Sequence, residues 1–191
     1  MAIAARTARE RLVEAASRLF YAEGIHAVGV DRVIAEAGVA KATLYTHFAS
    51  KDELVAAYLA RRSDRWAAAV LARAASAGSA PGVSAPMALA AFDVLAERVS
   101  SPDYRGCPFI NAAAEFPGPG PVADQVAAHR RRVRETFAEL IGEPGHDLGR
   151  LATIVALYDG AMSAAYLDHD PTVVDHARRA AEELLRHPRG G

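Results

Sequence analysis

Five polar side chains lie within one seven-residue stretch of the chain and could bind nucleic acid. They are Lys41, Thr43, Tyr45, Thr46 and His47. Together they offer a positive charge, hydroxyl and imidazole groups and an aromatic ring, with no carboxylate among them. A helix that lies in the major groove of DNA needs such groups, because phosphates and many base edges present acceptors. We therefore expect this stretch, together with Ala42 inside it, to contact double-stranded DNA.

Two short helices and a tight turn must hold these groups in place. Val33 and Ile34 give the first helix its apolar face, and Gly38 ends that helix where a positive φ is needed. In the second helix Leu44 and Phe48, spaced four residues apart, face inward and leave the polar side chains outside. A two-turn helix is not stable alone in water, so we expect both helices to pack on neighbouring helices.

The run AGVAKATLYTHFASKDEL, which covers the turn, the second helix and the start of a third, resembles a known signature. It is similar to the pattern AGVSKGTLYxHFxSKxxL of TetR-type (TetR/AcrR) bacterial transcriptional regulators, and the resemblance extends over roughly residues 7–60. The chain departs from the family at Ile34, where a small alanine usually stands four residues before the turn glycine. The alternative, an ordinary αα-hairpin, does not explain why the KATLY and SKDEL runs occur together.

The helix ends and the resemblance complete the predicted DNA-contacting set. Tyr45 and His47 match family positions that contact backbone phosphates. Lys51 lies in the first turn of the third helix, where N–H groups and the helix dipole already favour an anion. Val30 and Arg32 lie at the start of the first short helix. For each of these residues the alternative is an ordinary solvated side chain.

Helical periodicity continues through the whole chain, and no alternating strand pattern occurs. Thr7 with Glu10, and Ser50 with Glu53, have the spacing of capping boxes. We predict an all-α fold of about nine helices, over about 7–23, 30–37, 40–48, 51–75, 86–99, 108–116, 121–141, 147–167 and 172–186. We expect a helix-turn-helix DNA-binding domain over 1–52, joined by a long helix to a ligand-binding and dimerisation domain over 53–191.

Composition limits the class of protein. The single Cys107 excludes an intramolecular disulfide and is typical of a reducing compartment. We expect no signal peptide, and no apolar stretch is long enough to cross a membrane. The net charge is −1, but residues 1–65 carry ten Lys+Arg against eight Asp+Glu, so the positive charge lies with the predicted DNA-binding domain. We therefore expect a soluble cytoplasmic protein without a membrane partner.

The last two predicted helices carry apolar stripes that suit a homodimer interface. A two-helix DNA-binding motif offers too little contact alone, and such motifs act as dimers on two half-sites of a palindromic operator. The resemblance implies a four-helix interface across the two-fold axis. The alternative is that these stripes pack only within one subunit. The predicted interface residues are Leu151, Ile154, Ala161, Ala165, Val173, Ala177, Ala181 and Leu184.

The resemblance also implies a cavity for a small-molecule effector among the middle helices. Asn111 and Glu115 are spaced four residues apart in an apolar segment and share a helix face. If buried, they would need polar partners, either a ligand or a neighbouring helix. The predicted ligand-binding residues are Tyr58, Trp66, Phe92, Cys107, Asn111, Glu115, Tyr158 and Met162. Most of the apolar ones could equally be ordinary core.

Other chemistry finds little support in the sequence. Cys107 precedes a proline that begins a helix, so its thiol could be activated, although an inert buried thiol is the favoured interpretation. The tripeptide 168–170 (DHD) is better explained as a helix-ending loop than as a metal site. There is no Gly-rich phosphate loop and no nucleophile elbow. We predict a TetR-like, ligand-responsive repressor without a cofactor; the alternatives are a DNA-binding protein without an effector and, less favoured, a helical enzyme.

Overall fold

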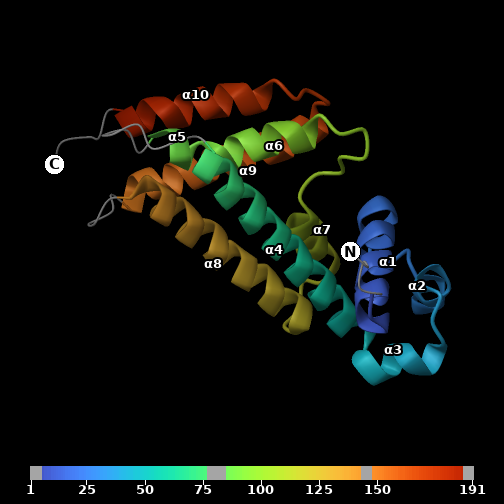
Figure 1. Ribbon diagram of the computed structural model, residues 1–191. Coiled ribbons are helices and arrows are strands. Elements are labelled where there is room, and N and C mark those ends of the chain that lie inside the picture. Colours follow the sequence, from blue (N-terminus) through green and yellow to red (C-terminus); the bar gives the residue numbers. More distant parts are fainter. Residues whose placement is uncertain (1–5, 77–84, 143–147, 187–191) are drawn as a thin grey trace, which may run out of the picture. The chain divides into compact units, whose positions relative to one another are not determined.

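The computed structural model describes residues 6–76, 85–142 and 148–186, and these residues form helices and connecting turns with no strand (Figure 1). The fold is all-α, as predicted. The helices are α1 (Ala8–Glu23), α2 (Val30–Ala37), α3 (Lys41–His47), α4 (Lys51–Ser76), α5 (Ala85–Ala88), α6 (Ala90–Val99), α7 (Pro108–Glu115), α8 (Pro121–Ile141), α9 (Leu148–Leu167) and α10 (Val173–Arg186).

One predicted helix is divided in the structure. The segment expected as a single helix over 86–99 becomes α5 and α6, separated by Leu89. Leu89 keeps φ −81° and ψ −11°, and its carbonyl accepts the Phe92 N–H at 2.9 Å. This is one tighter, 3₁₀-like turn, which explains why helical periodicity in the sequence continues across the break.

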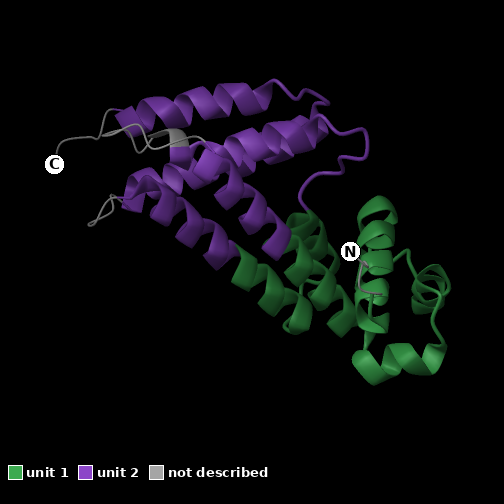
Figure 2. Ribbon diagram, in the orientation of Figure 1, with its two compact units in different colours: residues 1–63, 108–129 green, residues 64–107, 130–191 purple. Residues whose placement is uncertain are grey.

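The chain forms two compact units, and each unit consists of two separate segments of the sequence. Unit 1 contains residues 1–63 and 108–129, and unit 2 contains residues 64–107 and 130–191 (Figure 2). α7 therefore belongs to the same unit as α1, α2 and α3, although more than forty residues of unit 2 precede it. The domain boundary expected between residues 52 and 53 stays a prediction.

Local capping fixes where two helices of unit 1 begin. At α1 the Thr7 hydroxyl accepts the Glu10 N–H at 3.2 Å, and the Glu10 carboxylate accepts the Thr7 N–H at 2.8 Å, which completes the predicted capping box. These bonds from Thr7 lower the pKa of Glu10. At α4 Ser50 caps Glu53 N–H at 3.2 Å, but the Glu53 carboxylate reaches one residue further back, to Ala49 N–H at 2.8 Å.

Each unit has its own buried core. In unit 1 the core joins α1 to the two short helices and the start of α4, and it includes Leu12, Phe20, Val33, Leu44 and Tyr58. In unit 2 an aromatic group lies at the centre, with Phe92 5.6 Å and Phe137 5.5 Å from the ring of Tyr158. Edge-to-face arrangements such as these stabilise the pairs beyond the area that they bury.

Candidate nucleic-acid interface

The turn between α2 and α3 is a complete Schellman motif. Gly38 has φ 61° and ψ 46°, the left-handed conformation that its position in the sequence predicted. Its N–H donates to the Ala35 carbonyl at 3.2 Å, and the Val39 N–H donates to the Ile34 carbonyl at 3.3 Å. In this motif the side chains at the positions of Ile34 and Val39 commonly pack together, and both are half-buried here. The turn therefore accommodates Ile34 in place of the usual alanine.

The two faces of α3 are divided as the sequence predicted. Leu44 is 0% exposed and Phe48, just after the helix, is 3% exposed. On the other face Lys41, Ala42, Tyr45, Thr46 and His47 are exposed, while Thr43 is half-buried. Tyr45 is 52% exposed, so its ring can be reached from solvent. The exposed face is free of carboxylates and available to a groove.

Several residues predicted to contact DNA also contact other residues of the protein. Lys41 Nζ lies 2.8 Å from Asp31 Oδ1 at the start of α2, and this hydrogen bond raises the pKa of Lys41. Arg32 pairs with Glu23 at the end of α1. Thr46 Oγ1 donates to the Ala42 carbonyl at 3.0 Å. Val30 is half-buried.

Lys51 differs from the other cations of this surface. Its ammonium lies 5.8 Å from the centre of the Phe20 ring, over the aromatic face. The side chain is half-buried, and burial lowers its pKa, although the nearby carboxylates of Glu115 and Asp52 act in the opposite direction. Lys51 is thus held at a fixed place beside the α1 core.

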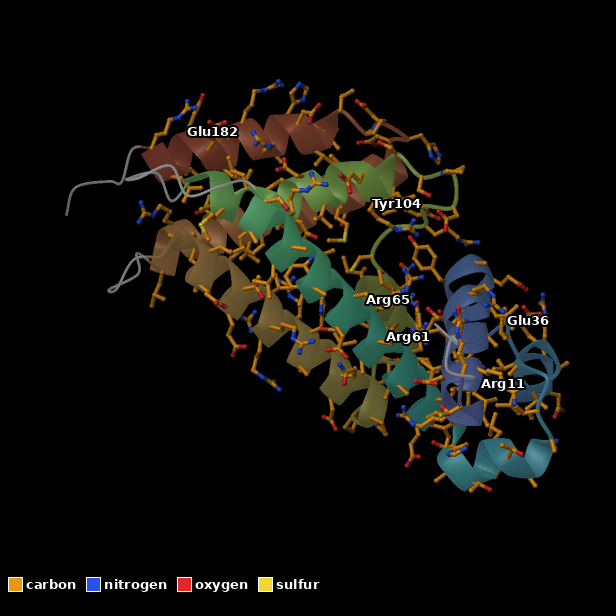
Figure 3. All side chains as sticks on the ribbon, viewed as in Figure 1. Arg11, Glu36, Arg61, Arg65, Tyr104 and Glu182 are labelled. Carbon is orange, nitrogen blue, oxygen red and sulfur yellow. The ribbon has the colours of Figure 1, made fainter. Side chains whose placement is uncertain are left out.

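Three residues of α1 and α2 that hold the turn were not predicted from the sequence. Arg11 donates to the Gly38 carbonyl at 3.4 Å, and Arg18 donates to Glu36 at 2.7 Å; Arg11 and Glu36 are labelled in Figure 3. Both links connect α1 to residues 18 or more positions away. No local pattern indicates such pairs, because arginines and glutamates on exposed helix faces are common.

A groove beside the end of α3 was also not predicted. It has a volume of about 330 Å³ and is lined by Arg9, His47, Phe48, Glu53, Ala56, Ala57, Ala60, Pro121 and Gln125. The Arg9 guanidinium lies 5.3 Å from the centre of the Phe48 ring. His47, predicted to contact DNA, therefore also borders the first turns of α4 and α8 within unit 1.

Comparison with known proteins places this geometry in a family. Residues 12–58 match the family described as "Bacterial regulatory proteins, tetR family", and residues 86–181, about half of the chain, match "Tetracyclin repressor-like, C-terminal domain". The chain belongs to the TetR family. It is a DNA-binding transcriptional regulator and not an enzyme.

Solved structures of TetR-family regulators agree over nearly the whole chain. SCO4454 from Streptomyces coelicolor is 40% identical, with a TM-score of 0.81 and coverage of 94% of each chain. A putative TetR regulator from Streptomyces avermitilis is 27% identical, with a TM-score of 0.73 and coverage of 93% of this chain and 99% of that one.

One curated relative matches a short part of the chain. The transcriptional activator FasR from Mycolicibacterium smegmatis is 48% identical over 56 residues, which are 29% of this chain and 26% of FasR. This chain therefore aligns with about a quarter of the length of that relative.

In this TetR-family chain, part of the predicted ligand-binding set gathers in unit 2. Trp66 Nε1 donates to the Tyr158 hydroxyl at 2.9 Å, and Phe92 packs against the same ring. Met162 packs against this core as well, and its carbonyl accepts the Tyr104 hydroxyl at 2.7 Å. Burial raises the pKa of Tyr158. Cys107 is half-buried in the same unit.

The remaining predicted ligand-binding residues lie in unit 1. Tyr58 is 1% exposed and packs edge-to-face on Phe20 at 5.8 Å. Asn111 is exposed, and the carboxylate of Glu115 accepts backbone N–H groups of the loop between α1 and α2. The Asn111 and Glu115 pair is thus not buried as a pair, and Glu115 has a protein partner. An effector cavity stays a prediction.

The predicted dimer residues divide by burial. Ile154, Ala161, Ala165 and Ala181 are buried inside unit 2 of a single chain, as in the alternative that these stripes pack within one subunit. Leu151, Val173, Ala177 and Leu184 are half-buried and pack against the same core. The sides of α9 and α10 that face away from this core are what a second copy could contact.

The loop before α10 has a local explanation. Asp170 accepts the Thr172 N–H at 2.9 Å and its hydroxyl at 2.7 Å, and these bonds lower the pKa of Asp170. His169 has φ 53° in this turn. Within the described residues no group of three or more His, Cys, Asp or Glu could hold a metal ion, and no helix is long and apolar enough to span a bilayer.

Proposed function

We propose that this TetR-family regulator is a ligand-responsive repressor that binds a palindromic operator as a homodimer in the cytoplasm. One observation carries the DNA-contacting part of this proposal. The exposed face of α3, with Tyr45 52% exposed and Leu44 fully buried beneath it, is held by a glycine turn tied to α1. A helix anchored from below and polar above is what insertion into a major groove requires.

The outer side of α9 supports binding as a homodimer. Gly149, Ala152, Ala156 and Gly160 are exposed and follow one another at spacings of three or four residues, so they share a face. Small side chains allow a second helix to approach closely, because no large group keeps the backbones apart. Two copies joined in this way would present two α3 helices to the two half-sites of a palindrome.

Control by a small molecule is proposed from the resemblance and from the composition of unit 2. Trp66, Phe92 and Tyr158 form an aromatic cluster with one hydroxyl, and a cavity that opened beside it would suit an apolar or aromatic effector with a polar group. An effector acts only if it binds one conformation of the protein better than another. We propose that the protein represses transcription when no effector is bound. The name of FasR, which is 48% identical over 56 residues, records an activator.

A gel shift on DNA beside the protein's own gene, at two salt concentrations, tests the DNA-binding part. We expect a discrete complex of two subunits per site that weakens at higher salt. Lys51→Ala should lower the slope of log K against log salt by about one, because one phosphate contact is lost. Arg179→Ala, an exposed arginine of α10, is the matched control and should leave the slope unchanged. If the salt dependence of Lys51→Ala equals that of the wild type, Lys51 does not contact a phosphate.

The tight aromatic packing of unit 2 favours a second candidate, a TetR-family regulator without an effector. Phe92 and Phe137 are both 0% exposed and lie 6.1 Å apart. A thermal-shift screen with small apolar compounds separates the two candidates. A compound that raises the melting temperature and also weakens the DNA complex supports the ligand-responsive repressor. If no compound stabilises the protein, the effector-free regulator is favoured.

A further inference from the structure

Glu115, the last residue of α7, accepts hydrogen bonds from the loop that joins α1 to α2. Its Oε1 accepts the Ile25 N–H at 3.0 Å, and its Oε2 accepts the His26 N–H at 2.6 Å. These N–H groups follow the end of α1 at Gly24, so no helix carbonyl of α1 receives them. A carboxylate that accepts two backbone N–H groups makes charge-assisted bonds, about twice as strong as neutral ones.

Side-chain contacts surround this pair of bonds. His26 Nδ1 lies 3.4 Å from Glu115 Oε2, and the His26 ring lies 4.8 Å from the ring of Phe116, the residue after Glu115. Ile25 is 2% exposed, so its N–H would be costly to leave without an acceptor. The loop 24–29 is therefore fixed from a helix that is about 90 residues away in sequence.

The other end of α7 is fixed in the same unit. The Phe109 ring stacks on the His129 ring of α8 at 3.5 Å between centres, with 8° between the planes. His129 Nδ1 in turn lies 3.0 Å from Ser63 Oγ of α4, and both residues are buried. α7 is thus held at its start by α8 and α4, and at its end by the loop of the DNA-binding motif.

We propose that Glu115 is a positioning residue for DNA binding, which sets where α2 begins and hence how α2 and α3 meet DNA. Gly29, the N-cap of α2, comes three residues after His26. Val30 and Arg32 of the predicted DNA surface follow directly. Fixing the Ile25 and His26 N–H groups limits the positions that Gly29 can take, so the carboxylate acts on the DNA surface through the loop. This inference rests on the DNA-binding surface proposed above.

Whether DNA affinity rises or falls when the Glu115 carboxylate is removed separates a positioning role from a purely electrostatic one. Glu115 is an anion in the DNA-binding unit, and it lies close enough to Lys51 to influence that ammonium. Removing a negative charge from a DNA-binding module ordinarily strengthens binding, because the module becomes more positive. A positioning role predicts the opposite, a loss of affinity on removal.

The experiment compares Glu115→Gln, Glu115→Ala and the control Asp124→Asn, an exposed acid of α8 in the same unit. The probe is a duplex that the wild-type protein selects from a random-sequence pool. We expect about a tenfold loss of affinity for Glu115→Ala, a smaller loss for Glu115→Gln, which keeps one oxygen acceptor, and no loss for Asp124→Asn. Equal or tighter binding by Glu115→Ala would overturn the proposal.

Hydrogen exchange of the Ile25 and His26 amides, measured without DNA, tests the two hydrogen bonds to Glu115 directly. Protection should fall at these two amides in Glu115→Ala and be partly kept in Glu115→Gln, while amides within α9 stay unchanged. Unchanged protection at Ile25 and His26 would also overturn the proposal. Hydrogen exchange needs no DNA, so it tests the bonds from Glu115 independently of the proposed DNA surface. If the DNA surface itself were misplaced, Tyr45→Ala and Lys51→Ala would bind DNA normally.

Discussion

Two cations of the predicted DNA surface, Lys41 and Arg32, are paired with carboxylates of the protein. Lys41 pairs with Asp31 and Arg32 pairs with Glu23, and all four side chains are at least one-third exposed. Exposed pairs contribute little to stability, so phosphates could replace these carboxylates at little cost. The pairs keep the cations in place near α2 and α3 before DNA arrives. This limits the side-chain entropy that binding must remove.

Tyr45→Ala should weaken DNA binding without unfolding the protein. The Tyr45 ring is 52% exposed, so it contributes little to the core, whereas Leu44 beside it is fully buried. We expect a loss of about tenfold in affinity, measured by fluorescence anisotropy, with an unchanged melting temperature. Tyr166→Ala, an exposed tyrosine of α9, is the control and should bind DNA normally. Wild-type affinity for Tyr45→Ala would count against α3 as the recognition helix.

The buried hydroxyl of Tyr158 predicts a pH-dependent stability. Burial raises the pKa of Tyr158 above its ordinary value near 10, so the unfolded chain loses this proton at a lower pH than the folded chain. The contribution is therefore complete below pH 10 and is lost as pH rises from 10 toward the folded-state pKa. At pH 7 Tyr158→Phe should cost about 1 kcal/mol, because the hydroxyl that accepts from Trp66 is gone.

Urea denaturation of both proteins at pH 7 and at pH 10.5 measures this difference. The gap in unfolding free energy between wild type and Tyr158→Phe should shrink at the higher pH, since only the wild type has this ionisation. The other tyrosines are common to both proteins, so their effect cancels. A gap that widens with pH would contradict the assignment.

Among the helices, the DNA-binding motif consists of two short ones, α2 and α3, which contacts with residues distant in sequence hold in place. α3 has seven residues and α2 has eight, and neither would be stable alone. The Schellman turn, the bonds from Arg11 and Arg18, and the buried Leu44 together place them on α1. Each link acts on a different part of the motif.

Gly38→Ala tests the turn between these helices. An added Cβ would meet no atom within 4 Å, so the cost comes from the backbone, whose φ of 61° disfavours residues with a side chain. We expect a loss of about 1–2 kcal/mol of stability and weaker DNA binding, measured by thermal denaturation and gel shift. Gly118→Ala is the matched control, because Gly118 also has open space around it but no positive φ. Equal stability of both variants would show that the turn tolerates a side chain.

The elements that the sequence predicted well are those set by neighbouring residues. Thr7 with Glu10 and the left-handed Gly38 depend on residues within a few positions, so their patterns are visible in the sequence. The bonds from Glu115 to Ile25 and His26 join residues about 90 positions apart, and nothing local indicates them. Tyr58 and Trp66, both among the ligand-binding residues that the family resemblance suggested, lie in different units.

For the whole molecule, the proposed homodimer would contact DNA with two copies of the α2–α3 motif instead of one. A single α2–α3 pair buries little surface on DNA, whereas two joined copies bind two half-sites together. The exposed small residues of α9 are the proposed place of joining, and the buried members of the predicted stripes hold α9 and α10 inside one chain.

Ala156→Arg should break the dimer and leave the chain folded. Ala156 is exposed in the middle of the small-residue face of α9, so a long charged side chain there would keep a second helix away. Sedimentation velocity should show a monomer with normal helical content and a DNA affinity at least tenfold lower. Ala68→Arg, an exposed alanine of α4 in the same unit, should stay dimeric. A dimer formed by Ala156→Arg would place the interface elsewhere.

Unit 1 is assembled from two separate stretches of the chain, and this restricts how operator specificity can be transferred between proteins. A chimera that receives only the first 63 residues would lose Glu115, Phe109 and His129 of its parent. The transplanted motif would then meet a foreign α7 whose last residue need not be an acid. An exchange that keeps the motif intact has to carry residues 108–129 as well. Recombination should therefore preserve the two stretches as a pair, so that the N-terminal helices are not an independent cassette.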